Sequence, residues 1–170
     1  MKAALMLALL GLVGCATTPS SVERYVLSDD LPSRLDAHAR AANLAPLEGS
    51  VEDELRVWIH GYMAADMLGY VVSRNSALKC HTTYDYANGV VSIDRARCRR
   101  WHQDEGVIGT LDDLAALDGK EWDCEVEDGF EVLVEGIHGG KRFVFRAGNP
   151  TFCNDSSSKT VVSLLDKVRR

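Results

Sequence analysis

The stretch EVLVEGIHGGKRFVFR, residues 131–146, decides the fold class of this 170-residue chain. Its large apolar side chains recur at every second position, at Val132, Val134, Phe143 and Phe145. That spacing is typical of β-strands with one buried face, and Gly139-Gly140 supplies a turn between two such strands. The stretch therefore predicts a β-hairpin with strands at 131–136 and 142–146, which Gly148-Asn149-Pro150 ends.

Further strands are predicted upstream of this hairpin. Residues 69–73, 78–86 and 90–95 contain the β-branched and aromatic residues that strands favour, and Asn88-Gly89 predicts a hairpin turn between the last two. Residues 55–60 (LRVWIH) also alternate, which favours a fourth strand. A helix stays possible in this last region, because the following residues lie at helical spacing: Val51, Leu55, Trp58 and Tyr62.

Three short helices complete the prediction. Residues 33–42 fit a helix capped by Ser33, residues 110–117 one capped by Thr110, and residues 156–168 one capped by Asp155. The sequence thus predicts an α+β fold, in which an antiparallel β-sheet of about five to seven strands carries two or three short helices. We expect one face of the sheet to be covered by the C-terminal helix, and residues 22–170 to form a single globular domain.

Four cysteines lie in the predicted domain, at Cys80, Cys98, Cys124 and Cys153. An even number in an oxidising compartment indicates two disulfides, for which three pairings are possible. The first two cysteines are nearly equidistant from Asn88-Gly89, and the other two from the turn at 138–140, so cross-strand geometry favours 80–98 and 124–153. Zinc is disfavoured, because the chain has no C-x-x-C and its histidines are isolated. We predict no metal and no cofactor.

The first residues, MKAALMLALLGLVGC, have the features of a secretory signal. Lys2 gives a positive start, and the apolar run 3–13 is shorter than the roughly 20 residues that cross a bilayer. Leu12-Val13-Gly14-Cys15 then resembles the lipobox of bacterial lipoproteins. The alternative, an ordinary signal peptide with a chance cysteine, is less favoured because no A-x-A-like ending lies at the right place.

The lipobox resemblance implies that residues 1–14 are removed and that Cys15 is the lipid attachment site. Three acyl chains would anchor the protein stably to a membrane. Residues 15–21 then form the lipidated N-terminus and a small, polar tether. Ala16, in place of an aspartate, favours the outer membrane by resemblance to lipoprotein sorting rules, so we expect a location in the bacterial cell envelope facing the periplasm.

The charge of the chain disfavours nucleic acid as a partner. The formal charge of the precursor is −6, and the loss of Lys2 makes the mature protein one unit more negative. The acidic residues crowd in one region, at Glu121, Asp123, Glu125, Glu127 and Asp128. They match no calcium-loop pattern and fit a solvated surface. The chain also lacks G-x-S-x-G and a separated pair of catalytic carboxylates, so we predict that it is not an enzyme.

A basic strip is the best candidate for partner binding: Arg95, Arg97, Arg99, Arg100 and Trp101. Three of its arginines alternate, so on a strand they would project from one face. One interpretation is an edge strand that its charges protect against aggregation. The other is a surface that recognises phosphate, a glycan carboxylate or an acidic protein. Tryptophans in a small domain are mostly core residues, but Trp101 flanks the strip and is the one most expected to contact a partner.

Two classes of function remain. The first is a membrane-anchored, non-enzymatic binding module of the envelope, within which we single out an inhibitor or immunity protein against a cell-wall-active protein. This rests on analogy with other small, acidic, disulfide-containing lipoproteins. The alternative is a structural or assembly lipoprotein of an envelope or secretion complex. The partners expected are the membrane, through Cys15, and a protein or envelope ligand.

Replacing Cys15 by serine should abolish incorporation of labelled palmitate and shift the protein out of the membrane fraction, because the thiol that carries the diacylglycerol is lost. The measurement is metabolic labelling followed by fractionation. As a matched variant, Ala16→Asp should keep the label but move the protein to the inner membrane of a two-membrane host. A wild-type chain that takes up no palmitate would contradict the lipobox assignment.

Overall fold

The computed structural model describes residues 24–47, 50, 52–61, 66–87, 90–102, 106–126 and 129–170. The lipobox, Cys15, the tether, the Asn88-Gly89 turn, and Glu127 and Asp128 of the acidic region lie outside these ranges. The hairpin predicted from residues 131–146 is confirmed as β8 (Phe130–His138) and β9 (Lys141–Gly148). Gly139 and Gly140 both adopt the positive φ angles that its turn requires.

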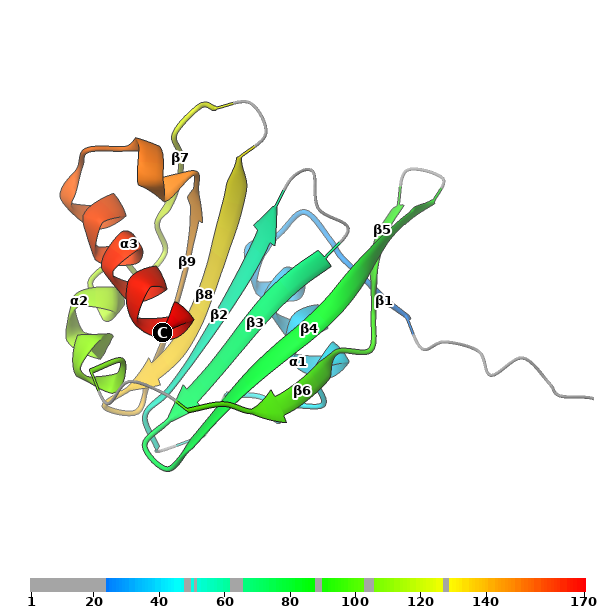
Figure 1. Cartoon of the computed structure of the whole chain (residues 1–170), viewed down its shortest axis with the longest axis horizontal. Helices are drawn as coiled ribbons and strands as arrows, with labels where there is room; N and C mark the ends of the chain where they lie inside the picture. Colours follow the sequence, from blue (N-terminus) through cyan, green and yellow to red (C-terminus); the bar gives the residue numbers. More distant parts are fainter. Residues whose placement is uncertain are drawn as a thin grey trace, which may run out of the picture.

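A single sheet contains every strand of the described chain (Figure 1). β8 pairs with β2 (Glu54–Gly61), which continues as a meander through β3 (Asp66–Ser73) and β4 (Ser76–Ala87). β5 (Val90–Asp94) and β6 (Arg97–Arg100) both pair with the far side of β4, and β1 (Arg24–Val26) pairs with β5. At the other end β7 (Glu121–Asp123) pairs with β9, and this is the one parallel pairing among the described strands.

The strand interpretation of residues 55–60 is confirmed, but the expected five to seven strands are too few, because the described sheet has nine. The strands that raise the number are β1, β6 and β7, with the sequences RYV, RCRR and EWD. Each is only three or four residues long, so it has too few residues to show an alternating apolar pattern. Their pairing depends on the edge that a neighbouring long strand offers.

Three α-helices pack on the sheet: α1 (Leu31–Ala41), α2 (Leu111–Ala115) and α3 (Ser156–Arg169). Short 3-10 turns, η1 (Ile108–Thr110) and η2 (Pro150–Phe152), precede α2 and α3. Asp155 caps α3 as predicted, through a hydrogen bond from the Ser158 amide. Thr110 stands at the N-cap of α2, but its side chain makes no capping bond. None of the described helices has the length and apolar character of a membrane span.

The predicted cap of α1 is wrong, because the helix begins two residues earlier. Asp30 is the N-cap and accepts a hydrogen bond from the Ser33 amide at 2.9 Å. Pro32 lies in the first turn, where a missing amide hydrogen costs nothing, and this placement lets the helix start ahead of Ser33.

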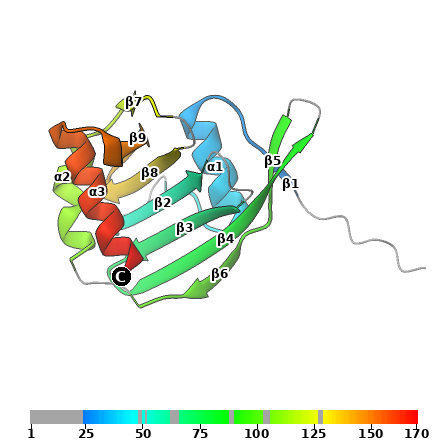
Figure 2. The same ribbon diagram turned by 45° about the horizontal axis from the view of Figure 1, so that its top comes forward.

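Both faces of the sheet are covered, and not only the one expected (Figures 1 and 2). One face packs against α2 and α3 through residues such as Val57, Val134 and Leu164. The opposite face packs against α1, around Trp58 and Leu133. Adjacent residues of β2 and β8 therefore face different cores, so these two central strands are buried on both sides.

Both disulfides have the predicted partners. Cys80 and Cys98 are directly opposed on β4 and β6, with 4.0 Å between their Cα atoms, as the symmetry argument requires. The second pair, Cys124 and Cys153, forms for another reason. These cysteines follow β7 and η2, and they meet because β7 returns alongside the end of β9.

Asn149 explains why the hairpin ends where it does. This buried residue adopts a left-handed backbone with φ 50°, which asparagine tolerates better than most residues. Its backbone amide donates a hydrogen bond to the Phe130 carbonyl, and its side-chain Oδ1 accepts one from the Phe130 backbone amide, both at 2.7 Å. Its Nδ2 also donates to Asp123 on β7. Asn149 thus joins the start of β8, the end of β9 and β7.

A small residue is required at Gly69, where β3 passes beneath Trp58. A Cβ atom at this position would lie 2.2 Å from a ring carbon of Trp58, which is only 1% exposed. Gly69→Ala should therefore lower the free energy of unfolding by about 2 kcal/mol, because an overpacked core must shift to admit the methyl group. Urea denaturation with the disulfides intact measures this.

Gly109→Ala is the matched control, since a Cβ there meets nothing within 4 Å. Its effect should stay within about 0.5 kcal/mol. Equal stabilities for the two variants would show that the Trp58 side chain does not need the space over Gly69.

Candidate functional site

The predicted basic strip lies at the edge of the sheet, on and beside β6. Arg97, Arg99 and Arg100 belong to this strand and are exposed. Arg95 is also exposed, but it lies in the two-residue break between β5 and β6. The expectation that it alternates with Arg97 and Arg99 on one strand is therefore wrong, because the chain leaves the β4 ladder at this break before it pairs again.

The pairing register decides which face each arginine occupies. Arg99 lies opposite Lys79 of β4, and Arg97 lies opposite His81, so these four side chains share the face that carries α2 and α3 farther along the sheet. Arg100 lies on the other face, with Cys98. The strip therefore presents cationic groups on both sides of an exposed edge strand.

The arginine side chains of the strip have unused hydrogen-bond donors. Within the described chain, the side chains of Arg95, Arg97, Arg99 and Arg100 form no hydrogen bond or ion pair. The Cys80–Cys98 bridge holds their strand to β4. A guanidinium with unused donors can bind a carboxylate or a phosphate in a bidentate manner, so this surface can recognise anions.

Trp101 is packed more than the contact-residue prediction expects. It is partly buried against the core under α2 and α3, and its ring meets the Tyr70 ring edge-on at a centroid distance of 5.4 Å. Lys79 lies over the other ring of this pair, with Nζ 5.5 Å from the Tyr70 centroid. Trp101 therefore fixes the end of the strip to the core and leaves only part of its surface for a partner.

A second group of charges, which the sequence analysis did not predict, is buried beneath α1. Glu131 of β8 is 3% exposed and accepts hydrogen bonds from Arg34 of α1, His60 of β2 and Arg146 of β9. Burial opposes its ionisation, but these three hydrogen-bond donors hold the pKa of Glu131 well below its usual range. The carboxylate thus fastens α1 to three strands.

Glu135 lies four residues after Glu131 on β8 and forms a second cluster of buried charges, or second centre, on the same face of the sheet. It contacts Arg56 of β2 at 3.4 Å and Arg142 of β9 at 3.1 Å, and both Glu135 and Arg56 are almost fully buried. Arg56 also donates to Glu54 and to the Ala45 carbonyl. Burial raises the pKa of Glu135, against the lowering effect of the two arginines.

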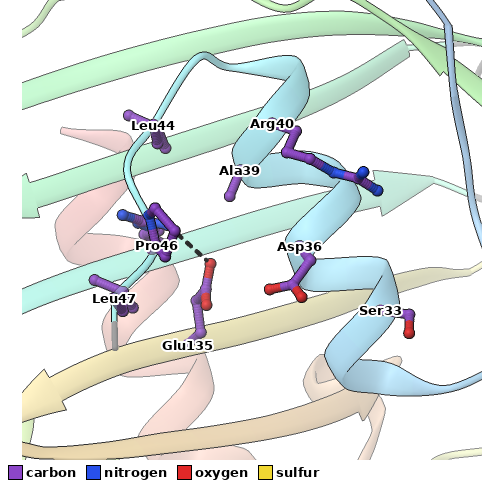
Figure 3. Close-up of a pocket in the computed structure, with 9 residues that line it drawn as sticks. Ser33, Asp36, Ala39, Arg40, Leu44, Pro46, Leu47 and Glu135 are labelled. Atoms are coloured by element: carbon purple, nitrogen blue, oxygen red, sulfur yellow. Dashed lines mark hydrogen bonds and ion pairs between the residues drawn. The ribbon is translucent and has the colours of Figure 1, made fainter. Parts of the chain in front are cut away.

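A pocket of about 440 Å³ opens beside this second centre, between α1 and the 44–47 segment (Figure 3). Asp36 points from α1 toward Glu135, and the Arg142 guanidinium lies near both carboxylates, 3.7 Å from Asp36. Leu44, Pro46 and Leu47 supply an apolar wall. The buried polar groups of the pocket are already bonded to one another, so a ligand would have to displace an existing ion pair.

Charged residues inside strands that were otherwise apolar, ELRVWIHG and FEVLVEGIH, were the available signal for these two centres. Two further side chains also have partners that the sequence did not suggest. His138 bridges Asp53 and Asp112, at 3.2 and 2.9 Å, and is not an isolated turn residue. Trp122 packs against the core and donates its Nε1 hydrogen to Ser158.

Comparisons with known proteins give little further guidance. No protein-family model matches the chain, and no curated protein matches it. A search of solved structures finds a crystal structure described as a "putative adenylate cyclase" from Bacillus halodurans, at 9% identity over 86% of each chain. Its TM-score is 0.23, which does not indicate a shared fold, so the similarity implies nothing about the activity of this chain.

Glu131→Gln should lower the free energy of unfolding at pH 7 by about 3 kcal/mol, because it leaves the Arg34 and Arg146 charges without a buried carboxylate. The loss should shrink with acidity. The folded-state pKa is depressed, so ionised Glu131 stabilises the protein above its unfolded pKa of about 4.3 and loses that contribution as pH falls below it.

Urea denaturation of wild type and variant at several pH values measures this difference. Glu121→Gln is the matched control, because Glu121 is exposed on β7 and its removal should change stability by no more than about 0.5 kcal/mol. A Glu131→Gln protein as stable as wild type at pH 7, or a difference that does not depend on pH, would contradict the assignment.

Proposed function

We propose that the protein is a lipid-anchored binding module of the bacterial envelope. We further propose that the basic strip on and beside β6, called the β6 strip from here on, binds an anionic surface of its partner. The single observation that carries this proposal is the group of four exposed arginines, none of which is paired within the described chain. The lipobox-like sequence at residues 12–15 supports the anchor and the extracytoplasmic location, and the lipid itself would make the membrane a permanent partner.

The contrast between the two charged regions supports the choice of this surface. Under α1 each guanidinium faces a carboxylate, which stabilises the fold and leaves little for a ligand. On β6 the guanidiniums face solvent, where their charges accelerate association with an acidic partner and select against a basic one. Arginine is also among the residues enriched in protein interfaces, and the Cys80–Cys98 bridge limits the entropy that β6 loses on binding.

A partner of this kind fits an inhibitor or immunity protein. Enzymes that cleave cell-wall glycans use a pair of carboxylates, and a rigid edge strand with arginines has the chemistry to occupy such a cleft. The same strip would serve a structural or assembly lipoprotein that binds an acidic subunit permanently. Deleting the gene distinguishes these two functions. Loss of an assembly protein should disturb the envelope even when no toxic enzyme is present, whereas loss of an inhibitor should not.

The double variant Arg97→Glu/Arg99→Glu should lose at least tenfold in affinity for the partner, because two attractive charges become repulsive at an interface. Full-length, tagged protein is solubilised in detergent, captured from envelope extract, and its bound proteins are quantified by mass spectrometry. A protein counts as the partner if the wild-type protein retains it and 0.5 M salt removes it. Its affinity for wild type and for the variant is then measured with purified proteins.

Lys120→Glu/Lys159→Glu is the matched control, because it makes the same change of net charge at exposed sites on the β7–α3 side of the molecule. The control should retain the partner at wild-type affinity. If both double variants bind equally well, or if no partner is both retained by wild type and sensitive to salt, the β6 strip is not the binding surface.

A further inference from the structure

Most of the exposed large apolar residues of the described chain lie at one end of the molecule. Five large apolar side chains of the described chain are exposed: Val26, Tyr86, Val90, Val126 and Phe152. Three of these lie where β1, β5 and the end of β4 project beyond the body of the sheet as a narrow ribbon (Figures 1 and 2). We call residues 24–26, 84–87 and 90–94 the arm.

The apolar residues occupy both faces of the arm. Val26 lies opposite Ser92, and Val90 lies two residues from Ser92 on the same strand, so these two valines share one face. Tyr86 lies opposite Val91 and therefore projects from the other face. The exposed fractions are 61% for Val26, 72% for Tyr86 and 46% for Val90. A rigid protein partner would cover one face, whereas a fluid medium surrounds both.

The arm is also the described part of the chain that lies nearest in sequence to Cys15. The described chain begins with β1 at Arg24, nine residues after that cysteine. At about 3.5 Å per extended residue, β1 can lie no more than roughly 30 Å from a lipidated Cys15. This distance is smaller than the roughly 40 Å thickness of a whole bilayer, so the tether keeps the arm close to the membrane surface.

The charges of the arm are compatible with such a position. Asp85 and Asp94 are its acidic residues near the valine face, and Arg24 forms an ion pair with each of them. Paired charges cost less to bring toward a low-dielectric medium than isolated ones do. Tyr86 is of the residue type that accumulates at the level of lipid headgroups, with its ring in an apolar layer and its hydroxyl in water.

We propose that the tip of the arm, Tyr86 with Val26 and Val90, inserts into the headgroup region of the bilayer that holds the lipid anchor. This inference rests on the proposed anchoring at Cys15 and adds the orientation of the domain. Because β6 pairs with β4 at residues 78–81 and the tip lies at residue 86, the arginines of β6 stand about 20 Å farther along the strand. The arginines are then held off the membrane, where a partner can reach them.

Site-specific photo-cross-linking of the full-length protein in membranes tests this orientation. A benzophenone amino acid replaces Tyr86, Arg99 or Phe152 in three separate proteins, and the phospholipids carry a radiolabel. Position 86 should give a lipid adduct at least fivefold more strongly than the other two positions. Phe152 is the matched control, since it is an aromatic residue with 62% exposure on η2, away from the arm.

Labelling with palmitate on the same samples separates the two proposals. Palmitate at Cys15 without lipid adducts at position 86 overturns the orientation and leaves the anchor intact. The absence of palmitate overturns the anchor itself. Adducts from position 86 to a protein, or lipid adducts that are stronger at position 99 than at 86, also overturn the inference, because the arm would then be a protein contact or the strip would lie on the membrane.

Discussion

Burial of the Glu131 and Glu135 carboxylates under α1 is the constraint on which the arrangement of this protein depends. A buried charge is costly unless oppositely charged groups surround it, and here those groups come from α1, β2 and β9 together. A slip of one residue in the pairing of β2 with β8 would turn these carboxylates into the apolar core under α3. The ion pairs therefore specify strand register and helix position at once, whatever their net contribution to stability.

The charged residues of the described chain fall into two groups: those that are paired within the fold and those that are free to bind a partner. Around Glu131 and Glu135, the buried carboxylates hold the neighbouring arginines in ion pairs. The buried polar groups of the pocket beside Asp36, Arg56 and Glu135, are also bonded to each other. The arginines of β6, in contrast, form no ion pair within the described chain, although the overall charge of the protein is negative. Within the described chain these exposed, unpaired arginines form a local positive region on a negatively charged protein, and such a region would orient the proposed acidic partner before contact.

The sequence predicted the long elements well, because their signals are local. The hairpin at residues 131–146 and the stripe of α3 contain their own periodicity, and both cysteine pairs were predicted correctly. The reason for the second pair was wrong, since the return of β7 beside β9 cannot be read from spacing. The buried charges were missed for a related reason. Single charged residues within β2 and β8 do not show which partners they will meet, and only the placement of α1 over that face encloses them.

The two disulfides divide the chain into two covalent rings, residues 80–98 and 124–153, and each ring encloses one hairpin connection. Such connections are where proteases cut folded domains most readily. A single cut within either ring leaves both new ends tied to the molecule, with the strands on either side still paired. The protein can in this way be cut at a hairpin without losing a fragment, a property that would suit the proposed location outside the cytoplasm.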